Sequence, residues 1–453
     1  MQTKVTEETQ AGGQSEERGP RRAGIAGAIG VILLVALEAA VVGRGDESVE
    51  TGQQAVSEPF DASPENEAAE QSAAPSREAA VADDNAAETE IDASDPLRDG
   101  EIIDSTLSSP DYDFTEASET ISAFIDQRNL NGAALVVVQR DDGVVHEEYW
   151  GDFDADRVSL VSTASKGVAA GVLVRLSDQG LLDLDAPVAD VVDWGTGNPE
   201  ITPAQLLSNS SGLPGLFPNL EFEPYACQWS AESSLQDCAR QAFTTPDDDA
   251  SIDEPDNIAR YGGVQWQVAG AVAEAASGRS WSDLIGETYL EPCGLEAGAF
   301  GFSNGFLEET YPRDFNGDSA TLPVTENPNI EGGLYATAPA FAEFLLMNVR
   351  GGLCGDGERA LSQDGLDAMH ADRIGEVYGG HLQADKAYGY GLGWYIDRQD
   401  GTRAEQGFWG AVPWLDREDG YGAYLVLEAN HSAGFSLFRS LQEPIDQAVL
   451  AAR

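Results

Sequence analysis

The sequence predicts an α/β fold of the α+β kind, in which an antiparallel sheet is flanked by helices and carries an inserted, mainly helical subdomain. Two strand-like runs joined by a short turn occupy residues 133–150, soon after the folded region begins. Comparable runs return only at residues 390–428, near the C-terminal end. Residues 200–350, between them, are typical of helices and long loops. A sheet built from both ends of the domain accounts for this order.

The first 43 residues predict export of the chain. Residues 1–22 are polar and end in Arg21 and Arg22, whereas residues 23–43 are apolar apart from Glu38. The apolar run is about long enough to cross a bilayer as a transmembrane helix. Because basic residues precede it and acidic residues follow it, the positive-inside rule places residues 1–22 in the cytoplasm and the bulk of the chain outside the cell membrane.

A cleaved signal segment is the alternative interpretation of residues 23–43, because small residues surround Val41 and Gly43. Glu38 weakens a membrane span, since an acidic group within a bilayer is costly, although it lies toward the outer end of the run. The first cysteine of the chain is Cys227, so a lipid-modified cysteine after the apolar run is excluded. The anchored form would be a single-pass membrane protein and the cleaved form would be secreted.

Residues 44–110 predict an acidic disordered linker. Glu, Asp, Ala and Ser dominate this stretch and aromatic residues are few. A segment with low hydrophobicity and high net charge buries too little apolar surface to offset its conformational entropy. The folded domain is therefore expected to span residues 111–453, which is long enough for a large hydrophobic core.

The chain is strongly acidic, with 25 basic and 79 acidic residues and a formal net charge of −54. This excess argues against nucleic acid or an anionic membrane surface as a partner, because both would be repelled. Lysine occurs only at Lys4, Lys166 and Lys386, so most basic residues are arginine. This composition suggests a halophilic protein, whose self-repulsion is screened by counterions, and we treat that as a hypothesis.

Four cysteines in an exported domain predict two disulfides. The simplest pairing joins Cys227 to Cys238 and Cys293 to Cys354, and four buried thiols are the alternative. The cysteines form no Cys-x-x-Cys pair and the four histidines are scattered along the chain, so no metal site is expected.

Within the domain the expected elements follow in order. An apolar face predicts a helix at residues 116–128, and a turn with Gly143 predicts a hairpin of strands 133–138 and 144–150. A helical stretch then runs from Leu160 to Gly180. The C-terminal part should contain strands at residues 390–396, 408–415 and 421–428 and an amphipathic helix at residues 435–452.

The stretch that begins at Leu160 carries the first candidate catalytic pair. Thr163 and Lys166 stand three residues apart, so on a helix both side chains lie on one face of the first turn. The positive end of the helix dipole opposes an ammonium there and favours a neutral lysine that can accept a proton from a hydroxyl. Such pairs are common by chance, but this chain otherwise relies on arginine, and only lysine loses its proton near neutral pH.

Four phrases in a fixed order resemble the serine beta-lactamase-related hydrolases, which comprise class C beta-lactamases, penicillin-binding D,D-peptidases and esterases. The phrases are TASKG at residues 163–167, GLLDLDAPV at residues 180–188, ITPAQLLSNSSGLPG at residues 201–215, and YGG at residues 261–263 followed by GAVAE at residues 270–274. The resemblance covers about residues 115–435. It implies a beta-lactamase/transpeptidase-like fold and no cofactor.

The resemblance also implies a nucleophile, a lysine partner and a tyrosine, which fall at Thr163, Lys166 and Tyr261. The tyrosine would carry a proton to the leaving group. The third family motif, Lys-Thr-Gly, His-Thr-Gly or Trp-Gly-Gly, falls at Glu405-Gln406-Gly407. Gly407 would then let the strand edge approach the substrate closely, and the backbone N–H groups of Thr163 and Phe408 would form an oxyanion hole.

Three residues depart from the family pattern. Thr163 replaces a serine, and its branched Cβ crowds the attacking oxygen, so slow turnover or a narrow substrate range is expected. Gly263 replaces an asparagine that would orient the substrate. Glu405 is acidic where the family carries a cationic or neutral residue, and it would repel carboxylate-bearing substrates such as penicillins or peptidoglycan stems.

The sequence therefore predicts an exported, membrane-tethered hydrolase that cleaves ester or amide bonds through an acyl-enzyme, with neutral esters favoured over beta-lactams. Its partner would be a small-molecule ester, amide or cell-wall substrate. The alternative is a catalytically inactive relative that binds cell-wall or small acyl ligands, which the altered motifs suggest. No feature of the sequence indicates an oligomeric state.

Overall fold

The computed structural model describes residues 111–197, 200–215, 225–244, 252–306, 310–355, 357–375 and 387–453. The predicted anchor and linker, residues 1–110, lie outside these ranges. Among the helices within these ranges, none is both long enough and apolar enough to cross a membrane.

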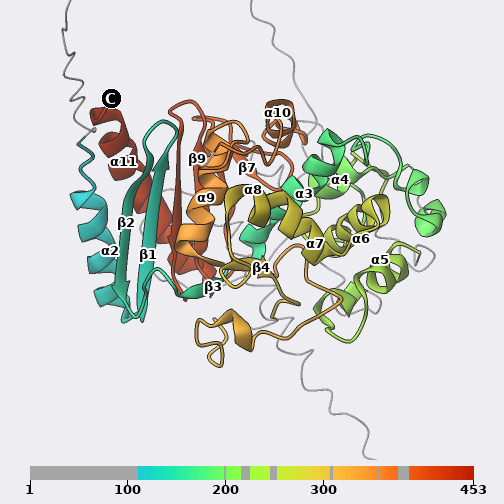
Figure 1. Cartoon of the computed structure of the whole chain (residues 1–453), viewed down its shortest axis with the longest axis horizontal. Coiled ribbons are helices and arrows are strands. Elements are labelled where there is room, and N and C mark those ends of the chain that lie inside the picture. Colours follow the sequence, from blue (N-terminus) through green and yellow to red (C-terminus); the bar gives the residue numbers. More distant parts are fainter. Residues whose placement is uncertain are drawn as a thin grey trace, which may run out of the picture. The chain divides into compact units, whose positions relative to one another are not determined.

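A seven-stranded antiparallel sheet forms one half of the domain, in the order β2-β1-β10-β9-β8-β7-β6 (Figure 1). Its N-terminal strands, β1 (Gly132–Gln139) and β2 (Gly143–Gly151), form the expected hairpin. Its C-terminal strands are β6 (Tyr388–Tyr390), β7 (Tyr395–Asp397), β8 (Arg403–Ala404), β9 (Ala411–Asp416) and β10 (Tyr421–Val426). Because β1 pairs with β10, the two ends of the domain meet inside the sheet, which confirms the predicted assembly.

Strand β1 shows why both faces of this sheet are covered. All of its residues are buried, and successive side chains of a strand point to opposite faces. Leu135 and Val137 join the core formed with helices α2 (Thr115–Arg128) and α11 (His431–Ala451). Val136 and Val138 join the larger core on the other face, where helix α9 (Ala338–Val349) packs. An uninterrupted apolar run fits such a doubly covered strand.

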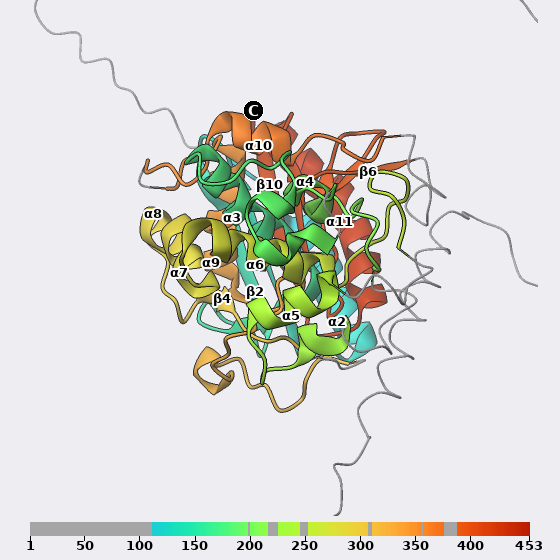
Figure 2. The ribbon, with the colours of Figure 1, turned by 90° about the vertical axis from the view of Figure 1, so that its right-hand side faces the viewer.

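The helical subdomain lies beyond the second face of the sheet, and its helices face the viewer in Figure 2. Its central helices are α3 (Lys166–Asp178) and α6 (Gln265–Ser277), which pack against each other. Around them lie α4 (Pro203–Leu207), α5 (Leu235–Phe243), α7 (Trp281–Ile285), the π-helical turn η6 (Gly286–Leu290) and α8 (Glu291–Cys293). A further helix, α10 (Gln363–Met369), packs against α3. The predicted architecture is therefore confirmed.

The region expected to be mainly helical also contains strands. A second sheet joins β3 (Val158–Leu160), β5 (Leu334–Thr337) and β4 (Phe300–Phe302), in that order. These strands are three or four residues long, too short for an alternating pattern to show in the sequence. Helix α9, within the same region, covers the large sheet rather than the helical subdomain.

Two of the predicted C-terminal strands have different bounds. The single strand expected at residues 390–396 is the antiparallel pair β6 and β7, because Gly393 adopts a positive φ of 79° and reverses the chain. The strand expected at residues 408–415 begins only at Ala411. The preceding residues form a turn, in which the N–H of Gly410 donates to the carbonyl oxygen of Gly407 at 3.0 Å.

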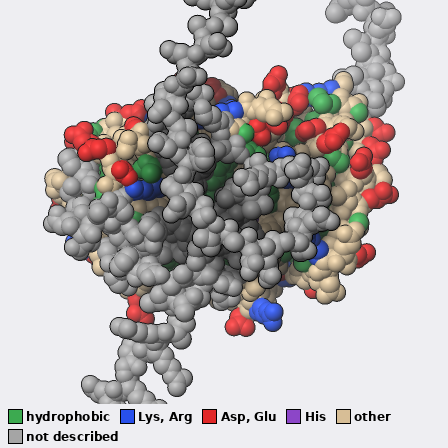
Figure 3. Space-filling view, turned by 180° about the vertical axis from the view of Figure 1, so that it is seen from behind, with side chains coloured by type: hydrophobic (Ala, Val, Ile, Leu, Met, Phe, Trp, Pro, Cys, Tyr) green, Lys and Arg blue, Asp and Glu red, His purple; other side chains and the backbone are tan. Residues whose placement is uncertain are grey.

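Both predicted disulfides are present. Cys227 pairs with Cys238, which joins the short helix η4 (Tyr225–Trp229) to α5. Cys293 pairs with Cys354, which joins α8 to the segment that follows α9. Acidic side chains are spread over the described surface seen in Figure 3, where basic side chains are few.

Candidate active site

The predicted nucleophile and lysine lie at the N-terminal end of α3. Residues Ser162–Ser165 form one 3-10 turn, η1, which leads directly into α3 at Lys166. Residues three apart eclipse one another in a 3-10 helix, so Thr163 and Lys166 share a face as expected. Ser162 has a positive φ of 53°, a conformation that costs energy for a residue with a Cβ and that clusters at functional sites.

Helix α3 is held deep in the domain by two glycines. A Cβ at Gly167 would lie 2.7 Å from the ring of Trp394, and one at Gly171 would lie 2.0 Å from the hydroxyl oxygen of Tyr289. Only glycine allows these aromatic side chains to lie so close to the helix. Lys166, at the first turn of this closely packed helix, is 0% exposed.

The amine of Lys166 contacts Tyr261, the third predicted catalytic residue. Lys166 Nζ donates to the Tyr261 hydroxyl oxygen at 3.1 Å and lies 3.4 Å from the Thr163 carbonyl oxygen. It also stands 5.7 Å from the ring centroid of Trp266. Burial lowers the pKa of Lys166, and the nearby carboxyl groups of Glu331 and Glu405 oppose that shift. The direction agrees with the predicted neutral amine.

Tyr261 links Lys166 to Glu405. The Tyr261 hydroxyl donates to Glu405 Oε1, and the Tyr390 hydroxyl donates to Glu405 Oε2 at 3.4 Å. Glu405 is 0% exposed, and its Oε1 lies 4.0 Å from Lys166 Nζ. Burial raises the pKa of Glu405 to about 8, although Lys166 and the two tyrosine hydroxyls favour its ionised form. Burial is the main reason that the pKa of Tyr261 lies well above its ordinary value, and the negative charge of Glu405 raises it further.

Glu405 does not have the surroundings expected from the sequence. A carboxylate that repels substrates would need to face them, but the Glu405 side chain is wholly buried and bonded to two tyrosines. Its raised pKa also favours the neutral acid at neutral pH. The expected repulsion of carboxylates by this side chain is therefore not supported, because burial disfavours its charge.

Glu331 is a member of this cluster that sequence reasoning missed. It is 3% exposed, and its Oε2 accepts the N–H of Gly263. Burial raises the pKa of Glu331, while Lys166 lowers it. It lies in a loop, outside any motif, so nothing in the sequence distinguishes it from the other acids. Gly263 itself has a φ of 83°, and a Cβ there would lie 2.5 Å from the carbonyl carbon of Gly215, so the family's asparagine does not fit this backbone.

The third motif follows β8 and runs beside Thr163. Thr163 Oγ1 donates to the carbonyl oxygen of Gln406 at 2.7 Å. A Cβ at Gly407 would lie 2.3 Å from the carbonyl oxygen of Val161, so the close approach that Gly407 permits is to this chain's own backbone. Within the described residues, Thr163 Oγ1 makes no hydrogen bond to Lys166 Nζ. The hydroxyl proton must therefore leave the Gln406 carbonyl oxygen before it can pass to the amine of Lys166.

The predicted oxyanion-hole residues lie in these neighbouring segments. The N–H of Thr163 belongs to the first turn of η1, where helical amides lack intrahelical acceptors. Phe408 belongs to the turn between Gly407 and Gly410. The structure thus brings Thr163, Lys166, Tyr261 and Gly407 into one region, and the role of the two amides stays a prediction.

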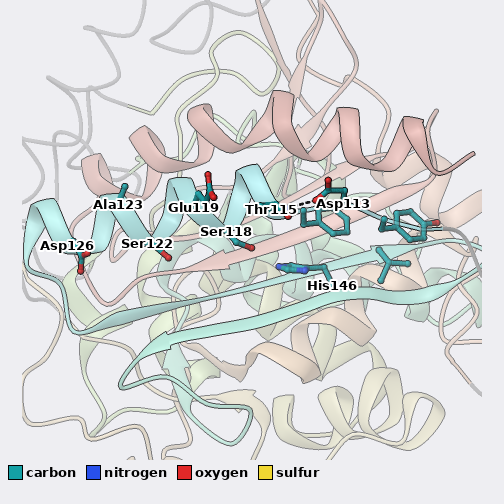
Figure 4. Close-up of a pocket in the computed structure, with 11 residues that line it drawn as sticks. Asp113, Thr115, Ser118, Glu119, Ser122, Ala123, Asp126 and His146 are labelled. Atoms are coloured by element: carbon teal, nitrogen blue, oxygen red, sulfur yellow. Dashed lines mark hydrogen bonds between the residues drawn. The ribbon is translucent and has the colours of Figure 1, made fainter.

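The groove in Figure 4 is a separate feature of the surface. It runs along α2 beside β2, and its lining includes Asp113, Ser118, Glu119, Asp126 and His146. None of the residues that line it belongs to the cluster around Lys166. In the part of the chain that the structure describes, no group of three or more His, Cys, Asp or Glu side chains is arranged to hold a metal ion.

Known proteins are similar to this chain in sequence or in fold. Penicillin-binding protein 4 of Amycolatopsis lactamdurans is 25% identical over 357 residues, which are 73% of this chain and 88% of that protein. The esterase/beta-lactamase LipL of Mycobacterium tuberculosis is 37% identical over 91 residues, only 19% of this chain and 20% of that protein. The crystal structure of a family VIII carboxylesterase covers 73% of this chain and 97% of its own, with a TM-score of 0.57 and 18% identity. That structural similarity shows that the two chains have the same fold.

The Beta-lactamase family model matches residues 117–442, well over half of the chain. The matched range contains Thr163, Lys166, Tyr261 and Glu405, together with both sheets. The resemblance drawn from the four sequence phrases is confirmed, and the chain belongs to the beta-lactamase family.

Proposed function

We propose that this protein is an acyl hydrolase in which Thr163 is the nucleophile, Lys166 the general base and Tyr261 the proton carrier. The observation that carries the proposal is the buried amine of Lys166, 0% exposed, 3.1 Å from the Tyr261 hydroxyl and one helical turn from Thr163. A lysine in such surroundings loses its proton far more readily than one in water.

Acylation begins when Thr163 Oγ1 attacks the carbonyl carbon of an ester. The Oγ1 proton passes to neutral Lys166 Nζ, and the carbonyl π electrons move to the oxygen, which the N–H groups of Thr163 and Phe408 would bind. When the carbon–oxygen bond to the alcohol breaks, the alkoxide takes the proton of the Tyr261 hydroxyl. Tyr261 regains a proton from Lys166, which lies 3.1 Å away. The products are an alcohol and an ester of Thr163.

Deacylation repeats these transfers with water in place of the alcohol. Water attacks the acyl carbon and gives one proton to Lys166, directly or through Tyr261. The bond between the acyl carbon and Thr163 Oγ1 then breaks, and Oγ1 takes a proton back from Lys166. The acid leaves and the threonine hydroxyl is restored. No redox partner or second substrate other than water is required.

Neutral esters are the proposed substrates, rather than beta-lactams or peptidoglycan stems. The described cluster contains two carboxyl groups, Glu331 and Glu405, and one amine, Lys166, which acts as a base in its neutral form. It therefore offers no positive charge to hold a substrate carboxylate. The similarity to an esterase/beta-lactamase supports esters over part of the chain.

An inactive acyl-binding relative is the second candidate. The observation that favours it is the hydrogen bond from Thr163 Oγ1 to the Gln406 carbonyl oxygen, which engages the proton that Lys166 would have to accept. This hydrogen bond must break before the proton can pass to the amine. A protein of this kind would bind acyl ligands without forming a covalent bond to Thr163.

We further propose that the domain acts outside the cell, anchored by residues 23–43 or released after their cleavage. The two disulfides support this location, because structural disulfides persist mainly in oxidising compartments. The length of the apolar run, residues 23–43, supports the anchor over a freely secreted form, because the apolar core of a signal peptide is usually shorter. Cell fractionation tests the proposal: the intact chain should be found in the membrane fraction and be open to protease added outside the cell.

Hydrolysis of p-nitrophenyl butyrate by the full chain tests the catalytic proposal. The wild type should release nitrophenolate and the Thr163→Ala variant should not, while a labelled penicillin should leave no covalent adduct on either. Ester cleavage that persists in Thr163→Ala would exclude Thr163 as the nucleophile. Penicillin labelling without ester cleavage would favour a penicillin-binding function instead.

A further inference from the structure

The side chains of Lys166, Tyr261 and Glu405 form a continuous hydrogen-bonded path through the buried site. Lys166 Nζ lies 3.1 Å from the Tyr261 hydroxyl oxygen, and that hydroxyl bonds to Glu405 Oε1. The two ends of the path, Nζ and Oε1, stand 4.0 Å apart. Lys166 and Tyr261 transfer protons in the proposed acyl transfer, whereas Glu405 takes no part in its bond changes.

Burial decides how one proton is shared between the ends of this path. Lys166 and Glu405 are both 0% exposed. An ion pair in such a place loses the hydration of both charges, whereas a neutral amine and a neutral acid lose much less. The pKa of the lysine is lowered and that of the glutamate is raised, in each case chiefly by desolvation. Both shifts favour the neutral pair.

We propose that Glu405 stores the proton that Lys166 must lose before it can act as a base, and that Tyr261 carries this proton between them. Glu405 is thus a positioning residue that acts through Tyr261. The inference rests on the proposed acyl-transfer function and adds a member to its proton path. It also gives a reason for an acid at a motif position where the family has a cation or a neutral residue.

The transfer conserves atoms and charge. One Nζ–H bond of the Lys166 ammonium breaks as its proton moves to the Tyr261 oxygen. The original Tyr261 O–H bond breaks as the hydroxyl's own proton moves to Glu405 Oε1, where a carboxylic O–H bond forms. Ammonium and carboxylate become amine and acid, and no electrons are exchanged. The two heavy-atom contacts are unchanged, but Glu405 now donates to Tyr261, and Tyr261 donates to Lys166.

Five titratable groups face Glu405. They come from α3, the loop before α6, the loop before β5, and strands β6 and β7, and they are Lys166, Tyr261, Glu331, Tyr390 and Tyr395. The three tyrosines have pKa values raised well above the ordinary value by burial, so they stay neutral through the neutral range. Burial also raises the pKa of Glu331, but its Oε2 accepts the N–H of Gly263 instead of the Tyr261 hydroxyl. The hydrogen-bonded path through Tyr261 therefore joins Lys166 to Glu405.

Loss of the stored proton at high pH should impair the release of a poor leaving group. Once Glu405 is ionised, the Tyr261 hydroxyl donates to the carboxylate and is held away from the departing alkoxide. The pKa of Glu405 places this change at a pH of about 8. An alkyl ester, whose alkoxide needs a proton, should be affected. A p-nitrophenyl ester, whose leaving group is stable as an anion, should not.

Infrared spectroscopy of the full chain tests the stored proton without any substrate. With carbon-13-labelled glutamate, the wild type at neutral pH should show a carboxylic-acid C=O band that disappears as the pH rises through about 8. Glu405→Gln should lack this band, and Glu331→Gln, which removes the other glutamate of the described cluster, should retain it but lose it at a lower pH, because Glu331 helps to raise the pKa of Glu405. A wild type without such a pH-dependent band overturns the proposal, even if Glu405→Gln does not fold. The proposal is also overturned if Glu405→Gln retains the carboxylic-acid band that disappears as the pH rises through about 8.

Kinetics of two esters provide the second test. For ethyl butyrate, kcat/KM of the wild type should fall above pH about 8, whereas that of Glu405→Gln should not, because a neutral amide donates to Tyr261 as the acid does. Glu331→Gln should keep the fall but move it to a lower pH, because the charge of Glu331 helps to raise the pKa of Glu405, and p-nitrophenyl butyrate should show no fall. An alkaline fall that Glu405→Gln leaves unchanged overturns the proposal while leaving acyl transfer by Thr163 intact. Loss of all cleavage in the wild type would instead count against the proposed function, and the infrared result would still decide the role of Glu405.

Discussion

Thr163 is the residue on which the proposed chemistry depends, and its branched side chain limits that chemistry. We expect Thr163→Ala to lower kcat/KM for a neutral ester by about 10³-fold or more, as for other nucleophiles that act in a unit with their base. Thr163→Ser keeps the hydroxyl and removes the methyl group that stiffens χ1, so it should retain or raise kcat. Initial rates with both variants check this. A serine variant as inactive as the alanine variant would contradict the role of the hydroxyl.

The buried acid Glu405 should make stability depend on pH. Its pKa rises from an ordinary 4.5 to about 8 on folding, so between these values the folded state binds a proton that the unfolded state has lost. That contribution is fully present below pH about 4.5 and disappears as the pH rises toward 8.

The Glu405→Gln variant has no such proton to lose. The free energy of unfolding of Glu405→Gln minus that of the wild type should therefore increase as the pH rises through this window, and then level off. Urea unfolding at several pH values measures it. A difference that is flat, or that decreases with pH, would mean that Glu405 is ionised in the folded protein.

The site residues that the sequence predicted share one property, which is membership of a local motif. Thr163 and Lys166 are three residues apart, and Tyr261 lies at a recognisable distance from Gly270. Glu331 and Tyr390 reach the same cluster from a distant loop and from β6. Their positions depend on tertiary packing, which no short-range spacing records. The burial of Glu405 also depends on tertiary packing, and it removes the support for the expected repulsion of substrate carboxylates.

At the scale of elements, the segment after β8 positions the nucleophile through Gly407. Gly407→Ala would place a Cβ 2.3 Å from the Val161 carbonyl oxygen and 2.8 Å from that of Ala411. Both are backbone atoms, so the segment must shift beside Thr163. We expect kcat to fall by roughly 10- to 100-fold, since small displacements of reacting groups are that costly.

Gly286→Ala is the matched control for this change. Gly286 lies in η6, has an ordinary helical φ of −53°, and has open space around the site of a Cβ. The substitution should leave kcat unchanged and alter the free energy of unfolding by less than about 1 kcal/mol. Equal effects of both substitutions on kcat would show that Gly407 has no special relation to the site.

The elements that sequence reasoning found are those with a strong pattern over many residues. The hairpin of β1 and β2, the helices α2 and α11 and the central strand β10 belong to this group. The strands β3, β4 and β5 are too short to carry a pattern. The reversal between β6 and β7 depends on a single glycine conformation at Gly393, and a run of Tyr, Gly and Trp otherwise resembles one strand.

At the scale of the whole molecule, the Cys293–Cys354 disulfide closes a larger loop than Cys227–Cys238, with sequence separations of 61 and 11. In the chain-entropy account, removing the larger loop's crosslink should cost about 4 kcal/mol of unfolding free energy and removing the smaller one about 3 kcal/mol. Double serine variants of each pair, unfolded in urea, check this order. A greater loss from the shorter loop would show that local packing, not chain entropy, dominates.

The net charge of −54 should make folding depend on salt. Repulsion between acidic side chains destabilises the compact state, and counterions screen it. If the protein is adapted to high salt, its melting temperature should rise from dilute buffer to molar potassium chloride. Calorimetry of the full chain measures this. A domain that melts no earlier in dilute buffer than in molar salt would refute halophilic adaptation.

The most direct test of the central claim is intact-mass spectrometry of the full chain after exposure to a small fluorophosphonate, followed by peptide mapping. We expect a single adduct on Thr163 that is absent from Thr163→Ala. It forms because Lys166, lacking exposure to water, can accept the hydroxyl proton. An adduct on Ser162 would place the nucleophile one residue away, and a folded protein that forms no adduct would contradict the claim that this site performs acyl transfer.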